Sequence, residues 1–196
     1  MGFMLDFKIL FIFIVPIWIV IRSVLCLKKR SNRQLSIKRE IVLNIFFIYI
    51  LCLIAITLFP LKINWDGDIS NVSINVVPVF NTMSDFVNVI QIPEQNYMIK
   101  FWIKNIIGNM LLLFPLGLLL PILWRRFNNM ITTVLISFLF SLGIEIIQLL
   151  SSYVGNVGRA FDIDDIILNT LGAWLGYVFY KKILLRLINK SDNTFY

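Results

Sequence analysis

Four ionisable side chains lie at or inside apolar segments of the sequence, where they could bind a ligand or take part in catalysis. Glu145 is within one apolar run, while Arg159, Asp162 and Asp165 precede another. A carboxylate in hydrocarbon costs on the order of 3 kcal/mol unless it is partnered, protonated or hydrated. Glu145 could act as a general base, with Arg159 holding a phosphate and Asp165 supplying a second carboxylate or binding magnesium. The same residues could instead recognise a charged headgroup without reacting with it.

Helical spacing brings these side chains and several amides to one depth. Asn109, Glu145 and Asn169 each lie about 6 to 8 Å inside the end of a predicted helix, at about 1.5 Å per residue. Spacings of three and four residues put Asp162 and Asp165 on the same helix face as Asn169. The predicted ligand-binding residues come from three helices and are Asn105, Asn109, Glu145, Gln148, Arg159, Asp162, Asp165 and Asn169. No catalytic residue and no metal ligand is predicted.

A purely structural role for this group is the alternative. Interhelical hydrogen bonds can fix helix packing without a ligand, and negative side chains stabilise a helix N-terminus. Asp162 can cap the last helix, and Asp164 points to a different face and is expected to be a solvated neighbour. The coincidence of Glu145, Arg159 and Asp165 at one depth favours a polar pocket, because ionisable groups within a membrane usually line a site.

The composition is that of an integral membrane protein, since 59% of the 196 residues are hydrophobic and only 15% are charged. Apolar runs predict an all-α polytopic helix bundle with about five transmembrane helices. These runs are residues 7–27, 41–59, 106–124, 130–150 and 166–180. The last has about 15 residues and spans only if its acidic start or the residues after Tyr180 add to its length.

The basic residues predict the orientation. Most of them lie between residues 28 and 39, at Arg125 and Arg126, and after residue 180. The positive-inside rule then places the N-terminus outside and the C-terminus inside, with the loops 60–105 and 151–162 outside. Arg22 lies near the inner end of the first helix and can snorkel to the interface. Because the basic residues are split among short segments, we expect no nucleic-acid partner.

The chain is predicted to hold one membrane domain. We expect an N-terminal anchor with a basic connection at 1–40, the membrane domain at 41–185 and a tail at 186–196. The first helix is expected to be retained, because its basic cluster follows the apolar run, unlike that of a signal peptide. In the long loop, segments 74–80 and 85–90 are too short to span and are expected to lie on the membrane surface or fold back over the helices.

Small and polar residues also predict helix contacts. Gly172 and Gly176 form a GxxxG face on the last helix, and Gly143 is expected to allow close approach beside Glu145. Asn44 in the second helix is expected to make a local helix contact. The chain has no His, and its two Cys predict neither a disulfide nor a metal site, so no cofactor is expected.

Three ordered segments carry a family resemblance. They are NIIGNMLLLFPLGLLLP at 105–121, SLGIEIIQLL at 141–150 and GRAFDIDDIILNTLGAWLGY at 158–177. Together they resemble the VanZ-like family, and NVVPVF at 75–80 is similar to that family's short Asn-x-x-Pro segment. The resemblance covers about residues 41–180, and the residues that match its motifs are Asn105, Asn109, Pro115, Gly117, Glu145, Gln148, Arg159, Asp162, Asp165, Asn169 and Gly172.

The resemblance implies a multi-pass protein of the bacterial plasma membrane. Founding relatives are linked to low-level resistance to teicoplanin-type glycopeptide antibiotics, and no established reaction comes with the family. We therefore expect a non-enzymatic protein whose partners are membrane lipids and a lipoglycopeptide or lipid-linked cell-wall precursor, bound near the outer leaflet. The alternative is an intramembrane enzyme acting on a lipid-linked envelope precursor, although no nucleophile motif is recognisable. A transporter would need a pathway through five helices, and no repeated halves are visible.

Overall fold

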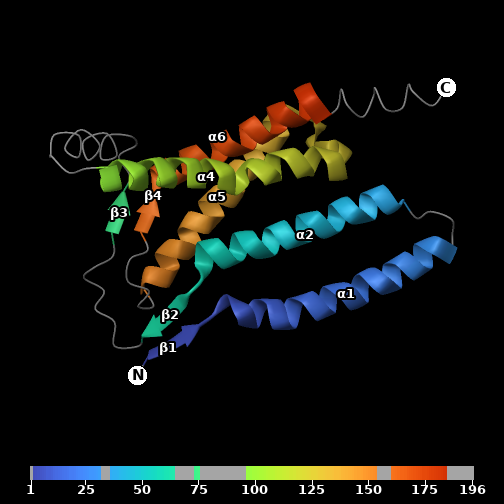
Figure 1. Ribbon diagram of the computed structural model, residues 1–196, viewed down its shortest axis with the longest axis horizontal. Helices are drawn as coiled ribbons and strands as arrows, with labels where there is room; N and C mark the ends of the chain where they lie inside the picture. Colours follow the sequence, from blue (N-terminus) through green and yellow to red (C-terminus); the bar gives the residue numbers. More distant parts are fainter. Residues whose placement is uncertain (1, 32–35, 65–72, 76–95, 154–159, 185–196) are drawn as a thin grey trace. The chain divides into compact units, whose positions relative to one another are not determined.

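The computed structural model describes residues 2–31, 36–64, 73–75, 96–153 and 160–184 (Figure 1). Within these ranges the helices are α1 (Phe7–Ser31), α2 (Ile37–Leu58), α4 (Asn96–Leu123), α5 (Met130–Tyr153) and α6 (Ile163–Phe179). All of them except α6 contain a segment long and apolar enough to cross a membrane. The predicted all-α fold of a polytopic membrane protein is therefore confirmed.

Helix α6 is the short member of the set. Its 17 residues fall below the span of about 20 that a bilayer requires. A π-helical turn at Tyr180–Leu184 continues the helix beyond its last regular residue. The residues after Tyr180 thus lengthen this helical segment, which is one of the two conditions under which it was predicted to span.

The chain forms two compact units. One consists of residues 1–71 and 150–159, and the other of residues 72–149 and 160–196. The first unit contains α1 and α2 with the short strands β1 (Gly2–Leu5) and β2 (Leu61–Asn64). The second contains α4, most of α5, and α6, with the strands β3 (Ser73–Asn75) and β4 (Ala160–Asp162).

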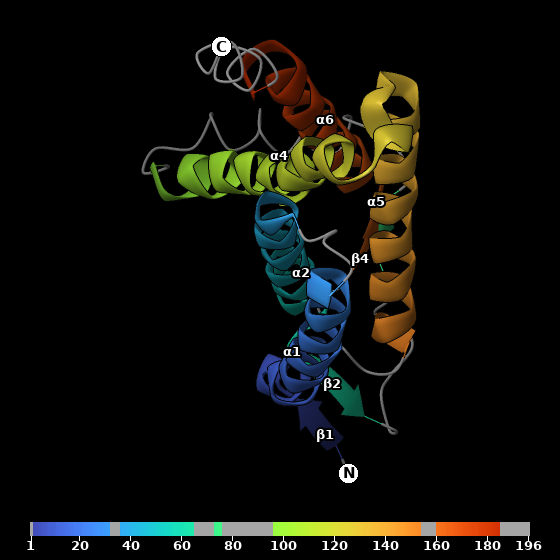
Figure 2. The same ribbon diagram turned by 90° about the vertical axis from the view of Figure 1, so that its right-hand side faces the viewer.

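The first unit is a helical hairpin closed by a two-stranded ladder. Helices α1 and α2 lie side by side in Figure 1 and in Figure 2. The indole ring of Trp18 on α1 stacks on the ring of Phe47 on α2, with 4.0 Å between the centroids. Strands β1 and β2 pair antiparallel, with Gly2 opposite Asn64. These strands, which precede α1 and follow α2, were not predicted from the sequence.

In the second unit, part of the long loop pairs with the entrance to α6. Strand β3 runs parallel to β4, with Asn75 opposite Asp162. The predicted loop segment 74–80 thus begins in a strand that folds back to the start of α6. Residues 76–80 and the second predicted segment, 85–90, lie outside the described residues.

Glycines bring α4 and α6 into backbone contact. A Cβ added at Gly172 or Gly176 of α6 would overlap the backbone of α4, at Met110 and Phe114 respectively. A Cβ added at Gly117 of α4 would likewise overlap the backbone of Ala173. The predicted GxxxG contact is therefore confirmed, since only small residues allow such an approach.

The prediction for Gly143 was wrong. A Cβ added at Gly143 of α5 would meet no atom within 4 Å. Helix spacing had placed this glycine near Glu145, but no neighbouring helix of the described chain approaches α5 at that position. Gly108 on α4 is equally open, so the close contact is restricted to the part of α4 that faces Gly172 and Gly176.

Candidate functional site

Asp162 joins three elements at the entrance to α6. It is the N-cap residue of this helix, and its side chain accepts a hydrogen bond from the backbone N–H of Asp164 at 2.9 Å. The same oxygen, Oδ1, accepts a hydrogen bond of 3.0 Å from the side-chain amide of Asn75 on β3. The backbone N–H of Asp162 donates to Oε2 of Glu145 on α5, also at 3.0 Å. The predicted capping role of Asp162 is confirmed, and the cap is tied to β3 and to α5.

Two further side-chain hydrogen bonds connect the three helices below this cap. Asn109 on α4 donates its amide N–H to Oδ1 of Asp165 on α6. Asn169, one turn further along α6, donates to the hydroxyl oxygen of Ser141 on α5 at 3.0 Å. Helix α6 is thus hydrogen-bonded to α4 through Asp165 and to α5 through Asn169.

The centre of the group is closed to solvent. Glu145 and Asn169 are each 1% exposed, and Ser141 is fully buried. Oδ1 of Asn169 has no hydrogen-bond partner among the described residues. A buried acceptor without a partner loses about 1 to 3 kcal/mol of hydration free energy. The interior of this group therefore has hydrogen-bonding capacity that the described side chains do not use.

Asp164 departs from its prediction. The sequence placed it on a solvated face of α6, but its residue is only 7% exposed. Helical periodicity considers the helix alone, whereas the start of α6 adjoins β4 and the paired strand β3. The expectation of a solvated Asp164 was wrong, and this carboxylate belongs to the buried polar region.

A column of buried polar residues runs along α5 and continues the buried polar group along this helix. Thr133, Ser137, Ser141 and Glu145 recur every fourth residue, and none is more than 1% exposed. The hydroxyl of Ser137 donates to the backbone carbonyl of Thr133 at 2.8 Å, and that of Thr133 to the carbonyl of Phe127 at 2.6 Å. These two hydroxyls donate to backbone carbonyls of α5 or of the residues before it. Among the hydrogen bonds described, those between the column and the start or the body of α6 are made by Ser141 and Glu145.

The remaining predicted site residues differ in their surroundings. Asn105 on α4 has an exposed side chain, and no described contact joins it to the group. Gln148 is half-buried on α5, one turn after Glu145. Arg159 lies outside the described residues. Asn75 was not among the predicted ligand-binding residues, although it is the first residue of the Asn-x-x-Pro segment, which was a sequence signal that pointed to it.

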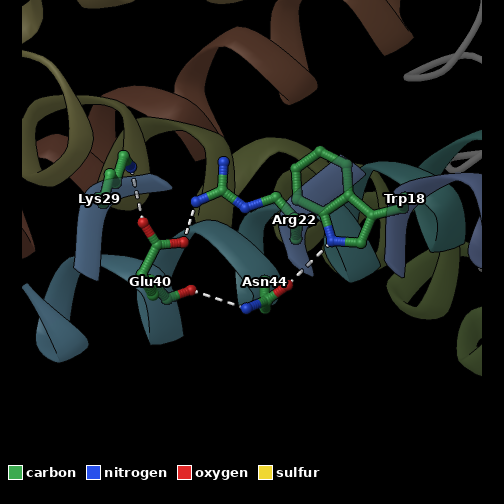
Figure 3. Close-up of polar contacts among 5 residues, drawn as sticks. All are labelled: Trp18, Arg22, Lys29, Glu40 and Asn44. Carbon is green, nitrogen blue, oxygen red and sulfur yellow. Dashed lines mark hydrogen bonds and ion pairs between the residues drawn. The ribbon is translucent and has the colours of Figure 1, made fainter. Parts of the chain in front are cut away.

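A second polar cluster lies in the α1–α2 hairpin (Figure 3). We call it the hairpin charge cluster, and it consists of Trp18, Arg22, Lys29, Glu40 and Asn44. The Glu40 carboxylate receives the Arg22 guanidinium on one oxygen and the Lys29 ammonium, at 2.8 Å, on the other. The guanidinium also lies over the Trp18 ring, 5.5 Å from its centroid.

This cluster corrects one prediction and extends another. Arg22 was expected to snorkel to the interface, but its side chain is only 14% exposed and pairs with Glu40. The Glu40 carboxylate takes the place of the lipid headgroups, with which a snorkelling Arg22 would have interacted. Asn44 makes the predicted local contact, donating to the backbone carbonyl of Glu40 at 2.9 Å. It also accepts a hydrogen bond of 2.9 Å from the indole N–H of Trp18, which joins α2 to α1.

The helices and the buried polar group define a polytopic helical membrane protein. A family model described as VanZ/LLP1 matches residues 46–186, and the chain belongs to this family. No curated protein and no solved structure matches the chain. The match contains all of α4, α5 and α6 with their polar residues, and it begins within α2.

Proposed function

We propose that this VanZ/LLP1 protein lowers the susceptibility of a bacterial cell envelope to teicoplanin-type glycopeptides. In this proposal the protein lies in the plasma membrane, and the polar group of α4, α5 and α6 binds an amphiphilic drug or a lipid headgroup near the outer leaflet. The founding relatives that this sequence resembles are linked to that resistance. Binding without a covalent reaction is sufficient for such a role.

The unpartnered oxygen of Asn169 is the observation that carries the proposal. A network that serves packing alone would be expected to satisfy its buried members, because each unsatisfied group costs stability. Here the amide nitrogen of Asn169 is bonded to Ser141, while its oxygen is free among the described residues. A ligand that brings a hydroxyl or amide N–H would complete this site, and a glycopeptide or a sugar-bearing precursor carries many such donors.

The position of the group along its helices supports an amphiphilic ligand. Asp165 lies in the first turn of α6, and Asn109 lies in the first half of the apolar segment Ile103–Leu123 of α4. A polar headgroup and an acyl chain would meet at such a boundary between polar and apolar parts of the helices. A teicoplanin-like molecule has a peptide-binding part and a lipid tail. With the predicted orientation, which places the start of α6 outside, such a molecule would reach this level from the outer leaflet.

Expression of the intact protein in a susceptible bacterium is expected to raise the inhibitory concentration of a lipidated glycopeptide. The inhibitory concentration of a glycopeptide without a lipid tail should change less, because the tail holds the drug at the interface. Growth inhibition assays with an empty vector as the control measure both values. An unchanged inhibitory concentration of the lipidated drug, with the protein present in the membrane, would refute the resistance role.

An intramembrane enzyme acting on a lipid-linked envelope precursor is the second candidate. The complete burial of the Glu145 carboxylate favours it, since a buried carboxylate is suited to proton transfer. Such an enzyme would change the lipid-linked precursors of cells that express it. Mass spectrometry of lipid extracts from cells with and without the protein would show a new or depleted species, whereas a binding protein would leave the extract unchanged.

A further inference from the structure

The hairpin charge cluster lies outside the part of the chain that matches the family. All five of its residues precede residue 46, where the match begins. The proposed function does not use them. Their role must therefore be inferred separately, from their charges and their surroundings.

Positive charge is in excess at this end of the hairpin. Glu40 is the only acidic residue in the sequence between Asp6 and Asp66. Both of its carboxylate oxygens are occupied, one by Arg22 and the other by Lys29. Two cations thus share one anion, so the cluster carries an excess of one positive charge.

Four more basic residues lie next to Lys29 or close to Glu40 in the sequence, and they are exposed. Lys28 and Arg30 belong to the last turn of α1, and Lys38 and Arg39 lie in the first turn of α2. The positive partial charge at a helix N-terminus adds to the charge of Lys38 and Arg39, and Glu40, the acidic residue of the same turn, is already paired with Arg22 and Lys29. Because these four side chains are exposed, their charges are available to a ligand outside the hairpin.

Exposed apolar side chains lie next to the exposed basic ones. Leu27 on α1 is 67% exposed and Ile37 on α2 is 69% exposed. Both helices are long and apolar enough to cross a membrane, so their basic ends fall at the level of the headgroups. A soluble anion would use only the charges, whereas a phospholipid would place its phosphate on the basic residues and its acyl chains on the apolar ones.

We propose that the basic end of the α1–α2 hairpin is a binding surface for the headgroup of an anionic phospholipid. Glu40 holds Arg22 and Lys29 in the hairpin, and the exposed residues Lys38 and Arg39 contact the lipid phosphate together with Lys28 and Arg30. Clusters of basic residues next to a membrane span attract anionic lipids in this way. The surface is independent of the drug-binding role proposed for α4, α5 and α6.

Lipid titration of the purified full-length protein tests this proposal. Native mass spectrometry would compare phosphatidylglycerol with phosphatidylcholine, and inorganic phosphate would be added as a competitor. Phosphatidylglycerol is expected to bind more tightly than phosphatidylcholine. The double variant Lys38→Gln/Arg39→Gln should weaken its binding about thirtyfold, which is about 2 kcal/mol at 1.4 kcal/mol per factor of ten.

A matched pair of lysines provides the control. Lys181 and Lys182 are also exposed and follow the last apolar helix, and Lys181→Gln/Lys182→Gln should leave the tight binding unchanged. Equal binding of both lipids would overturn the proposal, as would an equal loss in the control variant. Full competition by inorganic phosphate would also overturn it, because that result would assign the surface to a soluble anion.

Discussion

Replacement of Glu40 by Gln is expected to destabilise the α1–α2 hairpin by about 3 to 5 kcal/mol, the usual cost of breaking a buried ion pair by removing one partner. The Arg22 and Glu40 side chains are 14% and 10% exposed, so neither is well hydrated. Without the negative charge of Glu40, the guanidinium keeps its own charge at a site where it is poorly hydrated, with the Trp18 ring centroid 5.5 Å away. Unfolding of the full-length protein in detergent by a denaturant measures the loss.

A double-mutant cycle separates the ion pair from other effects of the substitution. Arg22→Gln combined with Glu40→Gln should recover part of the stability, with a coupling energy of about 0.5 to 3 kcal/mol, because the double variant leaves no buried charge from this pair. Lys29→Gln is the matched control, since the Lys29 side chain is 32% exposed and its pair should contribute about 1 kcal/mol or less. Additive effects of the Arg22 and Glu40 substitutions would contradict the buried pair.

Substitution of Gly172 by Ala is expected to cost about 1 to 3 kcal/mol, the range for overpacking a close contact. The added methyl group would overlap the backbone carbonyl of Met110, and a backbone cannot move aside as a side chain can. Separating α4 from α6 would also stretch the hydrogen bond between Asn109 and Asp165. Thermal unfolding in the same detergent is the measurement.

Gly108→Ala is the control for this substitution. Gly108 is a helical glycine of α4 with no atom within 4 Å of an added Cβ. The same chemical change there should be neutral or slightly stabilising, because Ala favours a helix more than Gly does. Equal losses from Gly172→Ala and Gly108→Ala would contradict the close α4–α6 contact.

The long helices and part of the polar group could be predicted because both depend on local spacing. Apolar runs define α1, α2, α4 and α5, and spacings of three and four bring Asp165 and Asn169 to one face of α6. The glycines of α6 also predicted its close contact with a neighbour. These features follow from helix geometry, which the sequence expresses directly.

Features that depend on pairing between distant segments were missed. The contact of Asn75 with Asp162 joins residues 87 positions apart and requires β3 to lie beside β4. Periodicity within α6 could not show that Asp164 would be buried at this junction. The Arg22–Glu40 pair also crosses from one helix to another, although the isolation of Glu40 among basic and apolar residues was a signal that could have revealed it.

The susceptibility of cells that carry Glu145→Gln is the most direct test of the proposed role of the polar group. Gln keeps the shape of Glu145 and can still accept the backbone N–H of Asp162, so the substitution removes the charge while preserving this hydrogen bond. Gly143→Ala, on the same helix in open space, is the control. The inhibitory concentration of a lipidated glycopeptide is measured for each variant at equal protein level in the membrane. We predict that Glu145→Gln abolishes the protection given by the intact protein while Gly143→Ala retains it. Full protection by Glu145→Gln would contradict a role for this carboxylate in the function.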